Sequence, residues 1–372
     1  MNEVTLFLDF VEDRRNSMEI YAAHLLKNLR ELDQHEFTFT EYRPVVGRLA
    51  RLLPDTANLR MRAARYIDYP AQARKRNGTV NHILDHGYAH LLKVLDPERT
   101  VITVHDIIPL LACRGKIKGV NKDRKRWLSE YSARFYKNAR HIIAISENTK
   151  RDLVAHCDCN PESITVIYYG INPVFKPINN VERNELRKTL GLPQNNSKLV
   201  LITGQEFYKN QPTSLKVMES LYQIYGPTVQ LVRLGRKSPE WSSAISNSPL
   251  KDQVINIDYL SSEDMLRLYN AVDCLLFPSW YEGFGLPPLE AMACGTPVVT
   301  SNAASLPEAV GGAGLMFAAD DAAGMAGAIE RLFNNHEFRN DQVRKGLEHV
   351  KKFAWHDHAT RTMNIYRNIV TE

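Results

Sequence analysis

The chain has 372 residues, of which 44% are hydrophobic and 24% charged, a balance that excludes a disordered tail or a low-complexity filament. Its length exceeds what one hydrophobic core supports comfortably and predicts two domains of ordinary size. No stretch reaches the roughly 18 consecutive apolar residues that a transmembrane helix needs, and Glu3 and Asp9 argue against a signal peptide. Cys157 and Cys159 lack a second cysteine pair at metal-ligand spacing, which favours reduced thiols and a cytoplasmic protein.

Short runs rich in Val, Ile and Leu alternate with amphipathic stretches along the whole chain. The predicted strands are residues 4–10, 37–42, 82–87, 100–106, 141–146, 163–170, 198–204, 228–235, 253–260, 272–279, 297–302 and 314–319. The clearest predicted helices are residues 17–32, 125–139, 261–271 and 358–370. Nearly continuous apolar strands between helices indicate α/β domains, each with a parallel sheet covered on both faces.

The strand–helix alternation restarts after residues 170–185, where two prolines and an asparagine pair predict a linker. We therefore expect a first doubly wound domain over residues 1–175 and a second over 186–352. Residues 353–372 are expected to form a C-terminal helix that packs back on the first domain.

Polar residues or glycines follow several predicted strands. They are Asp9, His86, His105, Asp106 and Ser146 in the first domain, and Gly204, Gly235 and Ser279 in the second. In an open parallel sheet, ligands bind beyond the carboxyl ends of the strands. If these two edges face each other, they form an interdomain cleft, where we expect the functional site.

The net charge of +5 is unevenly distributed. Residues 1–175 carry 27 Lys and Arg against 21 Asp and Glu, whereas residues 176–372 carry 20 against 21. The excess is densest over residues 113–127, with seven cations and one acid, and a looser basic run covers residues 43–76. This asymmetry predicts an anionic partner, such as a phosphate-bearing substrate or an anionic membrane surface; a solvated loop without a partner is the alternative. Nucleic acid is disfavoured, because Trp127 is the only aromatic residue of the dense run.

Residues 277–314 contain the most informative segment. A buried strand runs into a loop with Gly283 and Gly285, and Pro287 and Pro288 open a short helix, since proline suits the first helical turn. A glycine-rich loop that leads into a helix N-terminus presents backbone N–H groups and the positive end of the helix dipole. The segment therefore predicts an anion site suited to phosphate.

Two acids flank this predicted anion site. Glu282 lies in the loop, and Glu290 is expected in the first turn of the helix. A carboxylate accepts two hydrogen bonds side by side, which suits the vicinal diol of a ribose or hexose. One site would thus hold a diphosphate by backbone donors and sugar hydroxyls by an acid on either side. A charge pair that merely favours the helix dipole, worth about 0.3–1 kcal/mol, is the alternative.

The block PSWYEGFGLPPLEAMACGTPVV, residues 278–299, resembles the retaining nucleotide-sugar glycosyltransferases of family 4, most closely the bacterial mannosyltransferases of surface-polysaccharide synthesis. The spacing Glu282-x7-Glu290 carries the resemblance, and residues 144–153, 166–172 and 353–369 agree with it. It implies a GT-B fold, in which two facing Rossmann-like domains enclose the cleft. The first domain would bind the acceptor and the second the nucleotide sugar.

The resemblance also implies roles for the residues of this block. Glu290 would bind the ribose hydroxyls of the donor, and Glu282 would contact the transferred sugar. The backbone of Phe284, Gly285 and Leu286 would hold the sugar and the phosphate.

The loop TGQEFYKNQ, residues 203–211, follows the first strand of the second domain and departs from the family pattern. Gly204 and Lys209 match donor-binding positions, and Lys209 would clamp the diphosphate; a solvated loop lysine is the alternative. The arginine that family members usually place here is missing. Because electrostatic stabilisation of the leaving group is usually the largest catalytic contribution, we expect Arg233 to supply the second charge, with Arg236, or Lys209 and the helix dipole alone, as alternatives.

In the first domain, the resemblance implies that His105 meets the transferred sugar; a histidine satisfied by backbone groups is the alternative. The first loop lacks the glycines that the family commonly has there. Arg15 and Asn16 would replace them with side chains and, together with Asp106, would contact the acceptor.

The resemblance implies transfer of a hexosyl group, with mannose from GDP-mannose favoured, to a saccharide or polyprenyl-diphosphate-linked acceptor. The anomeric configuration would be retained by a front-face route, without a metal or other cofactor, because no His, Cys, Asp and Glu pattern with metal-ligand spacing occurs. The protein would be cytoplasmic, with peripheral attachment to the inner face of the membrane. UDP-glucose or a UDP-N-acetylhexosamine is the alternative donor. A phosphorylase, an epimerase or a non-catalytic nucleotide-sugar sensor is the alternative function.

Overall fold

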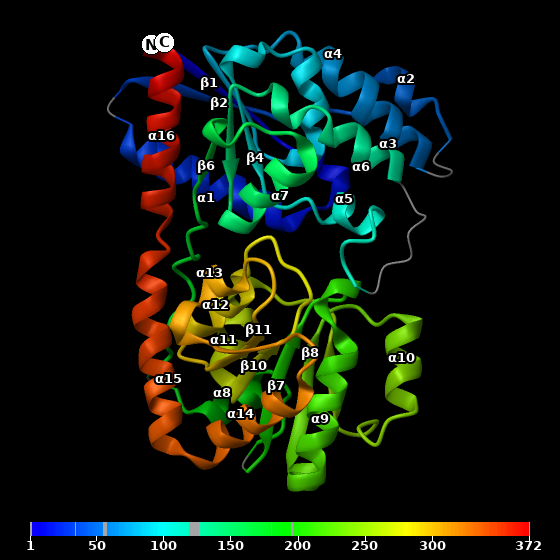
Figure 1. Ribbon diagram of the computed structural model, residues 1–372, viewed down its shortest axis with the longest axis vertical. Coiled ribbons are helices and arrows are strands. Elements are labelled where there is room, and N and C mark those ends of the chain that lie inside the picture. Colours follow the sequence, from blue (N-terminus) through cyan, green and yellow to red (C-terminus); the bar gives the residue numbers. More distant parts are fainter. Residues whose placement is uncertain are drawn as a thin grey trace. The chain divides into compact units, whose positions relative to one another are not determined.

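The computed structural model describes residues 2–33, 35–54, 58–118, 126–179, 181–194 and 196–371, which form two compact units (Figure 1). Unit 1 contains the described residues of 1–116, 121–170 and 354–372, and unit 2 contains those of 117–120 and 171–353. The division after residue 170 falls at the start of the predicted linker, and the division after 353 falls one residue from the expected start of the C-terminal helix. Residues 119–125, the middle of the dense basic run of residues 113–127, lie outside the described residues.

Unit 1 is built on a parallel six-stranded sheet. Its strands are β1 (Asn2–Phe7), β2 (Phe37–Tyr42), β3 (Val80–Ile83), β4 (Thr100–Val104), β5 (His141–Ala144) and β6 (Ile164–Val166). Its helices are α1 (Asn16–Leu32), α2 (Arg48–Arg51), α3 (Leu59–Ala63), α4 (Tyr69–Ala73), α5 (Ile108–Cys113), α6 (Arg126–Ala133), α7 (Glu147–Cys157) and α16 (Trp355–Thr371). The strand order is β2-β1-β3-β4-β5-β6, so the direction of winding reverses between β1 and β3.

Unit 2 is built on a second parallel six-stranded sheet. Its strands are β7 (Lys198–Thr203), β8 (Val229–Leu234), β9 (Val254–Ile257), β10 (Cys274–Phe277), β11 (Val298–Ser301) and β12 (Leu315–Phe317). Its helices are α8 (Arg183–Thr189), α9 (Gln211–Tyr225), α10 (Pro239–Ser246), α11 (Ser262–Ala271), α12 (Leu286–Ala293), α13 (Leu306–Val310), α14 (Ala322–Asn334) and α15 (His336–His349). The order β12-β11-β10-β7-β8-β9 is that of a doubly wound nucleotide-binding sheet, with its reversal between β7 and β10.

Each of the twelve strands predicted from the sequence overlaps a strand of the described residues, although the strand predicted at 82–87 lies at 80–83 and is followed by a 3-10 helix over His86–Lys93. The apolar runs form strands because both faces of each sheet are covered by helices. In unit 2, buried Leu231 and Leu276 from the sheet belong to one core with Leu221 of α9 and Ile329 of α14. The prediction of two parallel α/β sheets is therefore confirmed.

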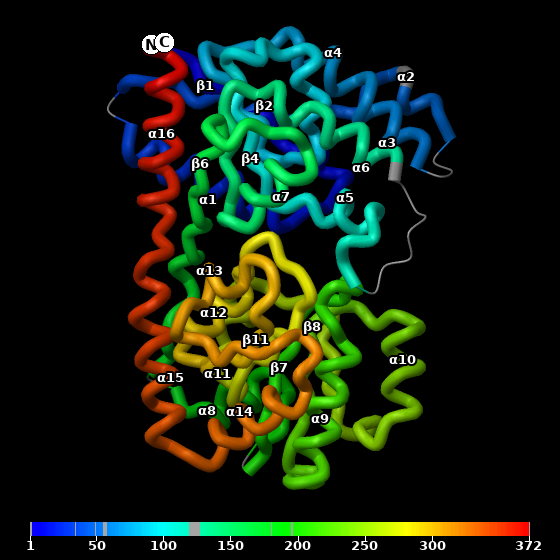
Figure 2. The backbone as a smooth tube through the Cα atoms, viewed as in Figure 1, coloured from blue at the N-terminus to red at the C-terminus, as the bar shows by residue number. Residues whose placement is uncertain are grey.

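The C-terminal helix α16 belongs to unit 1, where it runs beside α1 and is drawn in red in Figure 2. Buried polar groups hold it there. Tyr21 Oη lies 3.1 Å from His358 Nε2, and Tyr366 Oη lies 2.5 Å from His82 Nδ1. Burial lowers the pKa of His82 to about 3 and that of His358 to about 4, so both imidazoles are neutral at physiological pH. None of the helices in the described part of the chain is both long and apolar enough to cross a bilayer.

Candidate functional site

The loops after β7 and β10 lie side by side, because these strands are neighbours at the reversal point of the unit 2 sheet. Ligands of doubly wound sheets bind at this point, beyond the carboxyl ends of the strands. The loop after β7 contains Gly204 and Lys209, and the loop after β10 contains Glu282. The topology of unit 2 thus brings together three of the residues expected to bind the donor.

Lys209 and Glu282 form an ion pair between these two loops. Lys209 Nζ lies 2.9 Å from Glu282 Oε1, and the two side chains are only 12% and 9% exposed. Burial raises the pKa of Glu282, and the Lys209 ammonium opposes this effect. The pair carries no net charge, and one of the three Lys209 N–H donors is used within it.

The position of Lys209 depends on a glycine. Gly204 follows β7 with a φ of +91°, and a Cβ atom there would lie 2.8 Å from Lys209 Cε. Lys209 ends the 3-10 helix Phe207–Lys209, and its Nζ lies 4.6 Å from the centre of the Phe277 ring. A side chain at position 204 would therefore displace the lysine from its place above the end of β10.

Asn210 joins the two loops, a role that the sequence analysis missed. It adopts a left-handed conformation with φ of +54°, and its side chain is fully buried. Its amide nitrogen donates to the carbonyl oxygens of Pro278, at 2.9 Å, and Ala319, at 2.6 Å. The signal available in the sequence was an asparagine before Gln211 and Pro212, a pattern typical of a helix N-cap.

The turn before α12 requires a glycine at position 285. Gly285 has a φ of +117°, and a Cβ atom there would lie 2.9 Å from Leu306 Cδ2. Ser305 Oγ lies 2.9 Å from the carbonyl oxygens of both Glu282 and Phe284, which fixes the loop. Phe284 is buried, and its carbonyl oxygen is used within the loop by Ser305.

The N-terminus of α12 offers fewer N–H donors than an ordinary helix. The first three helical residues are Leu286, Pro287 and Pro288, and N–H groups at these positions have no acceptor within the helix. Proline has no N–H group. Leu286 is therefore the one position of the three that can donate to an anion.

Glu290 lies on α12 as its fifth residue, one turn later than the sequence analysis expected. Its Oε2 accepts a hydrogen bond of 2.9 Å from the hydroxyl of Tyr269, a fully buried residue of α11. Burial raises the pKa of Glu290 to about 7, and the hydrogen bond from Tyr269 opposes this effect. The carboxyl group is thus close to half-ionised at neutral pH.

Arg233 is placed differently from what the sequence analysis expected. Its side chain is fully buried, although it was expected to present a second charge to the diphosphate. Its guanidinium donates to the carbonyl oxygens of Gly235, at 2.6 Å, and Arg236, at 3.0 Å, and lies 4.5 Å from the centre of the Trp241 ring. These contacts use Arg233 to close the turn after β8, because strand pairing directs this side chain into the interior. Arg236 is exposed.

His105 is also placed differently from what was expected. It is 4% exposed, and its ring nitrogens face the Tyr169 hydroxyl and the carbonyl oxygen of Leu84, the latter at 2.7 Å. Burial lowers the pKa of His105 to about 4. The structure therefore shows a neutral histidine whose two ring nitrogens both have partners in unit 1, because the ring turns back from the end of β4.

The reversal point of the unit 1 sheet carries a polar cluster around Asp85, which was not predicted. Asp85 follows β3, is fully buried and binds Arg15, one of the expected acceptor residues. Asp9 follows β1 and shares a hydrogen bond with Asp85; burial and the Asp85 carboxylate raise the pKa of Asp9 to about 9. Burial and the Asp85 carboxylate thus favour the protonated form of Asp9, while Arg15 binds the Asp85 carboxylate.

His86 lies beside this cluster and is 15% exposed. Its Nδ1 accepts a hydrogen bond of 3.4 Å from the His105 backbone N–H and lies 3.7 Å from Asp85 Oδ1. The position of His86 at a strand end was noted in the sequence. Two other residues were expected to contact the acceptor substrate. Asn16 is exposed at the start of α1, and Asp106 accepts a hydrogen bond of 2.8 Å from the Ile108 N–H.

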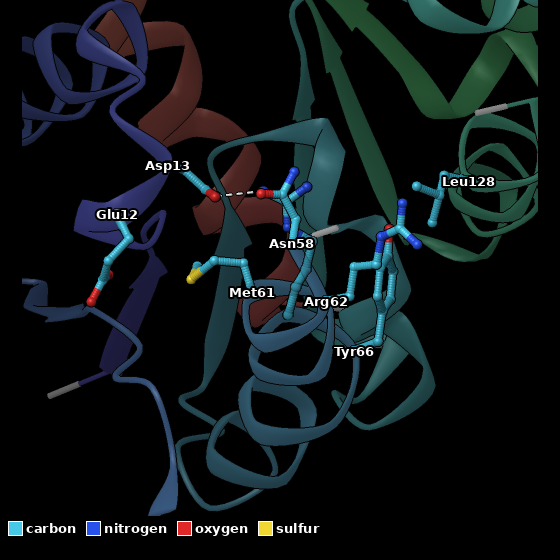
Figure 3. A pocket seen from close by; sticks show the side chains of 8 residues that line it. Glu12, Asp13, Asn58, Met61, Arg62, Tyr66 and Leu128 are labelled. Atoms are coloured by element: carbon cyan, nitrogen blue, oxygen red, sulfur yellow. Dashed lines mark hydrogen bonds and ion pairs between the residues drawn. The ribbon is translucent and has the colours of Figure 1, made fainter. Parts of the chain in front are cut away.

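Unit 1 also contains a cavity of about 290 Å³ (Figure 3). Its lining residues are Glu12, Asp13, Asn58, Met61, Arg62, Arg65, Tyr66 and Leu128. Arg65 Nη2 donates to Asp13 Oδ2 at 2.6 Å, and the Arg65 guanidinium lies 5.1 Å from the centre of the Tyr88 ring. Within the part of the chain that the structure describes, no group of three or more His, Cys, Asp or Glu residues is arranged to hold a metal ion.

Two family models match the chain. Residues 182–349 match the model described as Glycosyl transferases group 1, and residues 18–175 match the model described as Glycosyltransferase Family 4. The O-antigen chain mannosyltransferase B of Escherichia coli is 28% identical over 274 residues, which cover 73% of this chain and 70% of that protein. The serotype-specific mannosyltransferase WbdA of Escherichia coli is also 28% identical, over 70% of this chain but only 32% of WbdA.

Solved glycosyltransferase structures share the fold over the whole chain. Sucrose-phosphate synthase from Thermosynechococcus elongatus has a TM-score of 0.77 at 19% identity, and the match covers 100% of both chains. WaaG, a glycosyltransferase involved in lipopolysaccharide biosynthesis, has a TM-score of 0.74 at 14% identity, with 98% of this chain and 99% of WaaG covered. The sheets, the two matched models and these structures show that the chain belongs to the GT-B glycosyltransferases built from a Glycosyltransferase Family 4 domain and a Glycosyl transferases group 1 domain.

Proposed function

We propose that the protein transfers mannose from GDP-mannose to a saccharide or polyprenyl-diphosphate-linked saccharide in the synthesis of a surface polysaccharide. The observation that carries this proposal is the Lys209–Glu282 pair at the reversal point of the unit 2 sheet, beside the glycine turn that opens α12. Two relatives named as mannosyltransferases support the choice of sugar.

In this proposal the donor diphosphate binds between Lys209 and the start of α12. The Lys209 ammonium retains two N–H donors for phosphate oxygens, since one donor is used on Glu282. The N–H of Leu286 supplies a further donor at the positive end of the helix. Glu290, in its ionised form, accepts hydrogen bonds from the ribose hydroxyls, and Glu282 accepts them from the mannose.

The proposed reaction keeps the anomeric configuration by a front-face route. The bond between the anomeric carbon and the diphosphate oxygen breaks while the acceptor oxygen approaches from the same side. The departing phosphate oxygen takes the proton of the acceptor hydroxyl. Lys209 and the Leu286 N–H neutralise the charge that develops on the diphosphate, and the protein otherwise contributes positioning.

For the acceptor, we propose the polar cluster of unit 1. Arg15 and the His86 imidazole supply hydrogen-bonding groups held around the Asp85 carboxylate. Because Arg15 and Asp85 balance in charge and the protonated form of Asp9 is favoured, the cluster suits neutral sugar hydroxyls better than an anion. The basic excess of the first half would draw the protein to an anionic membrane, each nearby cation contributing about 1 kcal/mol.

The donor is tested by measuring the melting temperature of the protein with GDP-, UDP-, ADP- and dTDP-sugars. A ligand that binds only the folded state raises this temperature, and GDP-mannose is expected to raise it most. A larger rise with UDP-glucose or a UDP-N-acetylhexosamine would replace GDP-mannose by that donor. If no nucleotide sugar raises the melting temperature, the proposal is wrong.

Turnover separates a transferase from a nucleotide-sugar sensor. Wild-type protein should release GDP from GDP-mannose in the presence of an acceptor, and Glu282→Ala should lose this activity while it keeps its folded structure. A wild type that binds donor but never turns it over would be a sensor. Turnover that is abolished by EDTA and restored by Mg²⁺ would refute the metal-independent route, and a failure to float with anionic vesicles would refute membrane attachment.

A further inference from the structure

A cavity of about 680 Å³ lies at the other edge of the unit 2 sheet, beside the amino ends of β7 and β10. Lys198 is the first residue of β7, and Asp273 immediately precedes β10. The proposed donor site lies beyond the carboxyl ends of the same strands. Six residues of β7 span about 20 Å, so the two sites lie on opposite edges of the sheet.

The cavity is strongly basic. Its charged lining residues are Arg183, Arg187, Lys198, Arg339 and Asp273. Four cations minus one carboxylate leave a balance of +3 among the described lining residues. His336, Asn340 and Thr228 add polar groups that can donate hydrogen bonds to an oxygen-rich ligand.

The single carboxylate is already occupied. Asp273 Oδ1 accepts a hydrogen bond of 2.7 Å from Arg183 Nη1. Asp273 Oδ2 accepts two hydrogen bonds of 2.8 Å, one from Arg187 Nη2 and one from the Leu199 N–H. Arg187 is 3% exposed and also donates to two backbone carbonyl oxygens, so the Arg187–Asp273 pair is part of the framework of unit 2. Among the described residues that line the cavity, the remaining cations therefore have no second carboxylate to bind.

Arg339 is the cation with the least compensation. Its Nη1 donates 2.7 Å to the backbone oxygen of Asp273, whereas its buried Nη2 has no hydrogen-bond partner among the described residues. Burial and the nearby Arg183 charge lower the pKa of Arg339. Nη2 is itself buried, so its unpartnered N–H costs free energy, while the guanidinium adds to the cavity lining a positive charge that no ion pair among the described residues neutralises.

Lys198 is a second cation that no carboxylate compensates. Its Nζ lies 5.1 Å from the centre of the Tyr225 ring and 4.9 Å from that of Phe333. No ion pair joins Lys198 to an acid in the described part of the chain. The aromatic faces hold the ammonium at the cavity but leave its positive charge in place.

We propose that this cavity is an anion site that binds the phosphate group of a small molecule, with Arg339 and Lys198 as its principal ligands and Arg183 at its rim. A neutral sugar would leave the +3 balance unchanged, whereas a phosphate dianion reduces it and supplies acceptors for the cationic side chains that line the cavity. The site is separate from the proposed donor site, so a ligand bound here would act on unit 2 without competing with the nucleotide sugar.

The experiment measures the melting temperature of the full chain with inorganic phosphate, against sodium chloride at equal ionic strength. Phosphate at about ten times its dissociation constant is expected to raise the melting temperature by about 3 °C. Arg339→Gln and Lys198→Gln should each reduce this rise by at least half. Arg344→Gln, an exposed change on the same helix as Arg339, is the matched control and should keep the full rise.

Three results would overturn the proposal. Phosphate could fail to raise the melting temperature of the wild type. The rise could persist unchanged in both Arg339→Gln and Lys198→Gln. If Arg339→Gln does not fold, Lys198→Gln alone decides this point. The rise could disappear in Lys209→Met, which would assign the phosphate to the opposite edge. None of these results depends on whether the protein transfers mannose.

Discussion

Replacing Glu290 by glutamine should change how the stability of unit 2 depends on pH. The Glu290 carboxyl group is partly buried beside Tyr269, and burial raises its pKa from 4.5 to about 7. The folded chain therefore binds this proton more tightly than the unfolded chain. The resulting stabilisation is fully present below pH 4.5 and is lost as the pH rises through about 7.

The size of this effect follows from the two pKa values. At about 1.4 kcal/mol per pKa unit, the difference between 4.5 and about 7 corresponds to roughly 3 kcal/mol. For a unit of this size, each kcal/mol shifts the melting temperature by about 2–4 °C, so the wild type should lose about 6–12 °C relative to the variant. Glu290→Gln resembles the protonated side chain and lacks this loss.

The assay compares melting temperatures of wild type and Glu290→Gln between pH 4 and pH 9. The variant should match the wild type at pH 4 and exceed it at pH 9, with the change centred between these values. Glu337→Gln, a change at an exposed acid of α15, is the control and should follow the wild type throughout. Parallel profiles for Glu290→Gln and wild type would refute the assignment of a raised pKa to this carboxyl group.

Three further substitutions test the framework of unit 2. Lys209→Met leaves the buried Glu282 carboxylate unpaired and should lower the free energy of unfolding, measured by urea titration, by about 3 kcal/mol. The double variant with Lys209→Met and Glu282→Gln should recover part of this loss. An equal loss in the single and the double variant would contradict the pairing. Gly285→Ala places a Cβ atom 2.9 Å from Leu306 Cδ2 at a φ of +117° and should lower the free energy of unfolding by about 2 kcal/mol in the same titration. An unchanged urea midpoint would mean that the turn adapts to alanine without strain. Arg233→Met leaves two carbonyl oxygens unpaired and should lower the free energy of unfolding by about 2 kcal/mol. The rise in melting temperature with the donor should be unchanged. Loss of that rise would mean that Arg233 does contact the donor.

Local sequence patterns were enough to predict the elements and the glycine turn before α12. Strand β2 was predicted with the bounds that the structure shows, because a run of alternating bulky residues bounded by charged turns has few other conformations. Gly285 and the proline pair after it predicted the start of α12, since backbone restrictions act within a few residues. Glu282 and Lys209 were singled out separately by motif.

The pairing of these residues could not be predicted in the same way. Lys209 and Glu282 are 73 positions apart, and their contact depends on β7 and β10 being neighbours at the reversal point. His105 was expected to meet the transferred sugar and Arg233 to supply a second charge, yet both side chains are buried and donate to or face groups of their own unit. A position at the end of a strand does not reveal where the side chain points, because neighbouring loops compete for its polar atoms.

Composition, periodicity and the glycine and proline positions determined by themselves that this chain folds into parallel α/β sheets and has a glycine turn before α12. These are properties of short segments. They are set by the backbone restrictions of glycine and proline and by the pattern of apolar residues that each segment buries. Only the tertiary structure decided that Lys209 neutralises Glu282, that Asp85 holds Arg15, and that Arg339 is left without a full set of partners. Charges and hydrogen bonds are satisfied in space, so the partner of a polar group depends on which strands the fold places side by side.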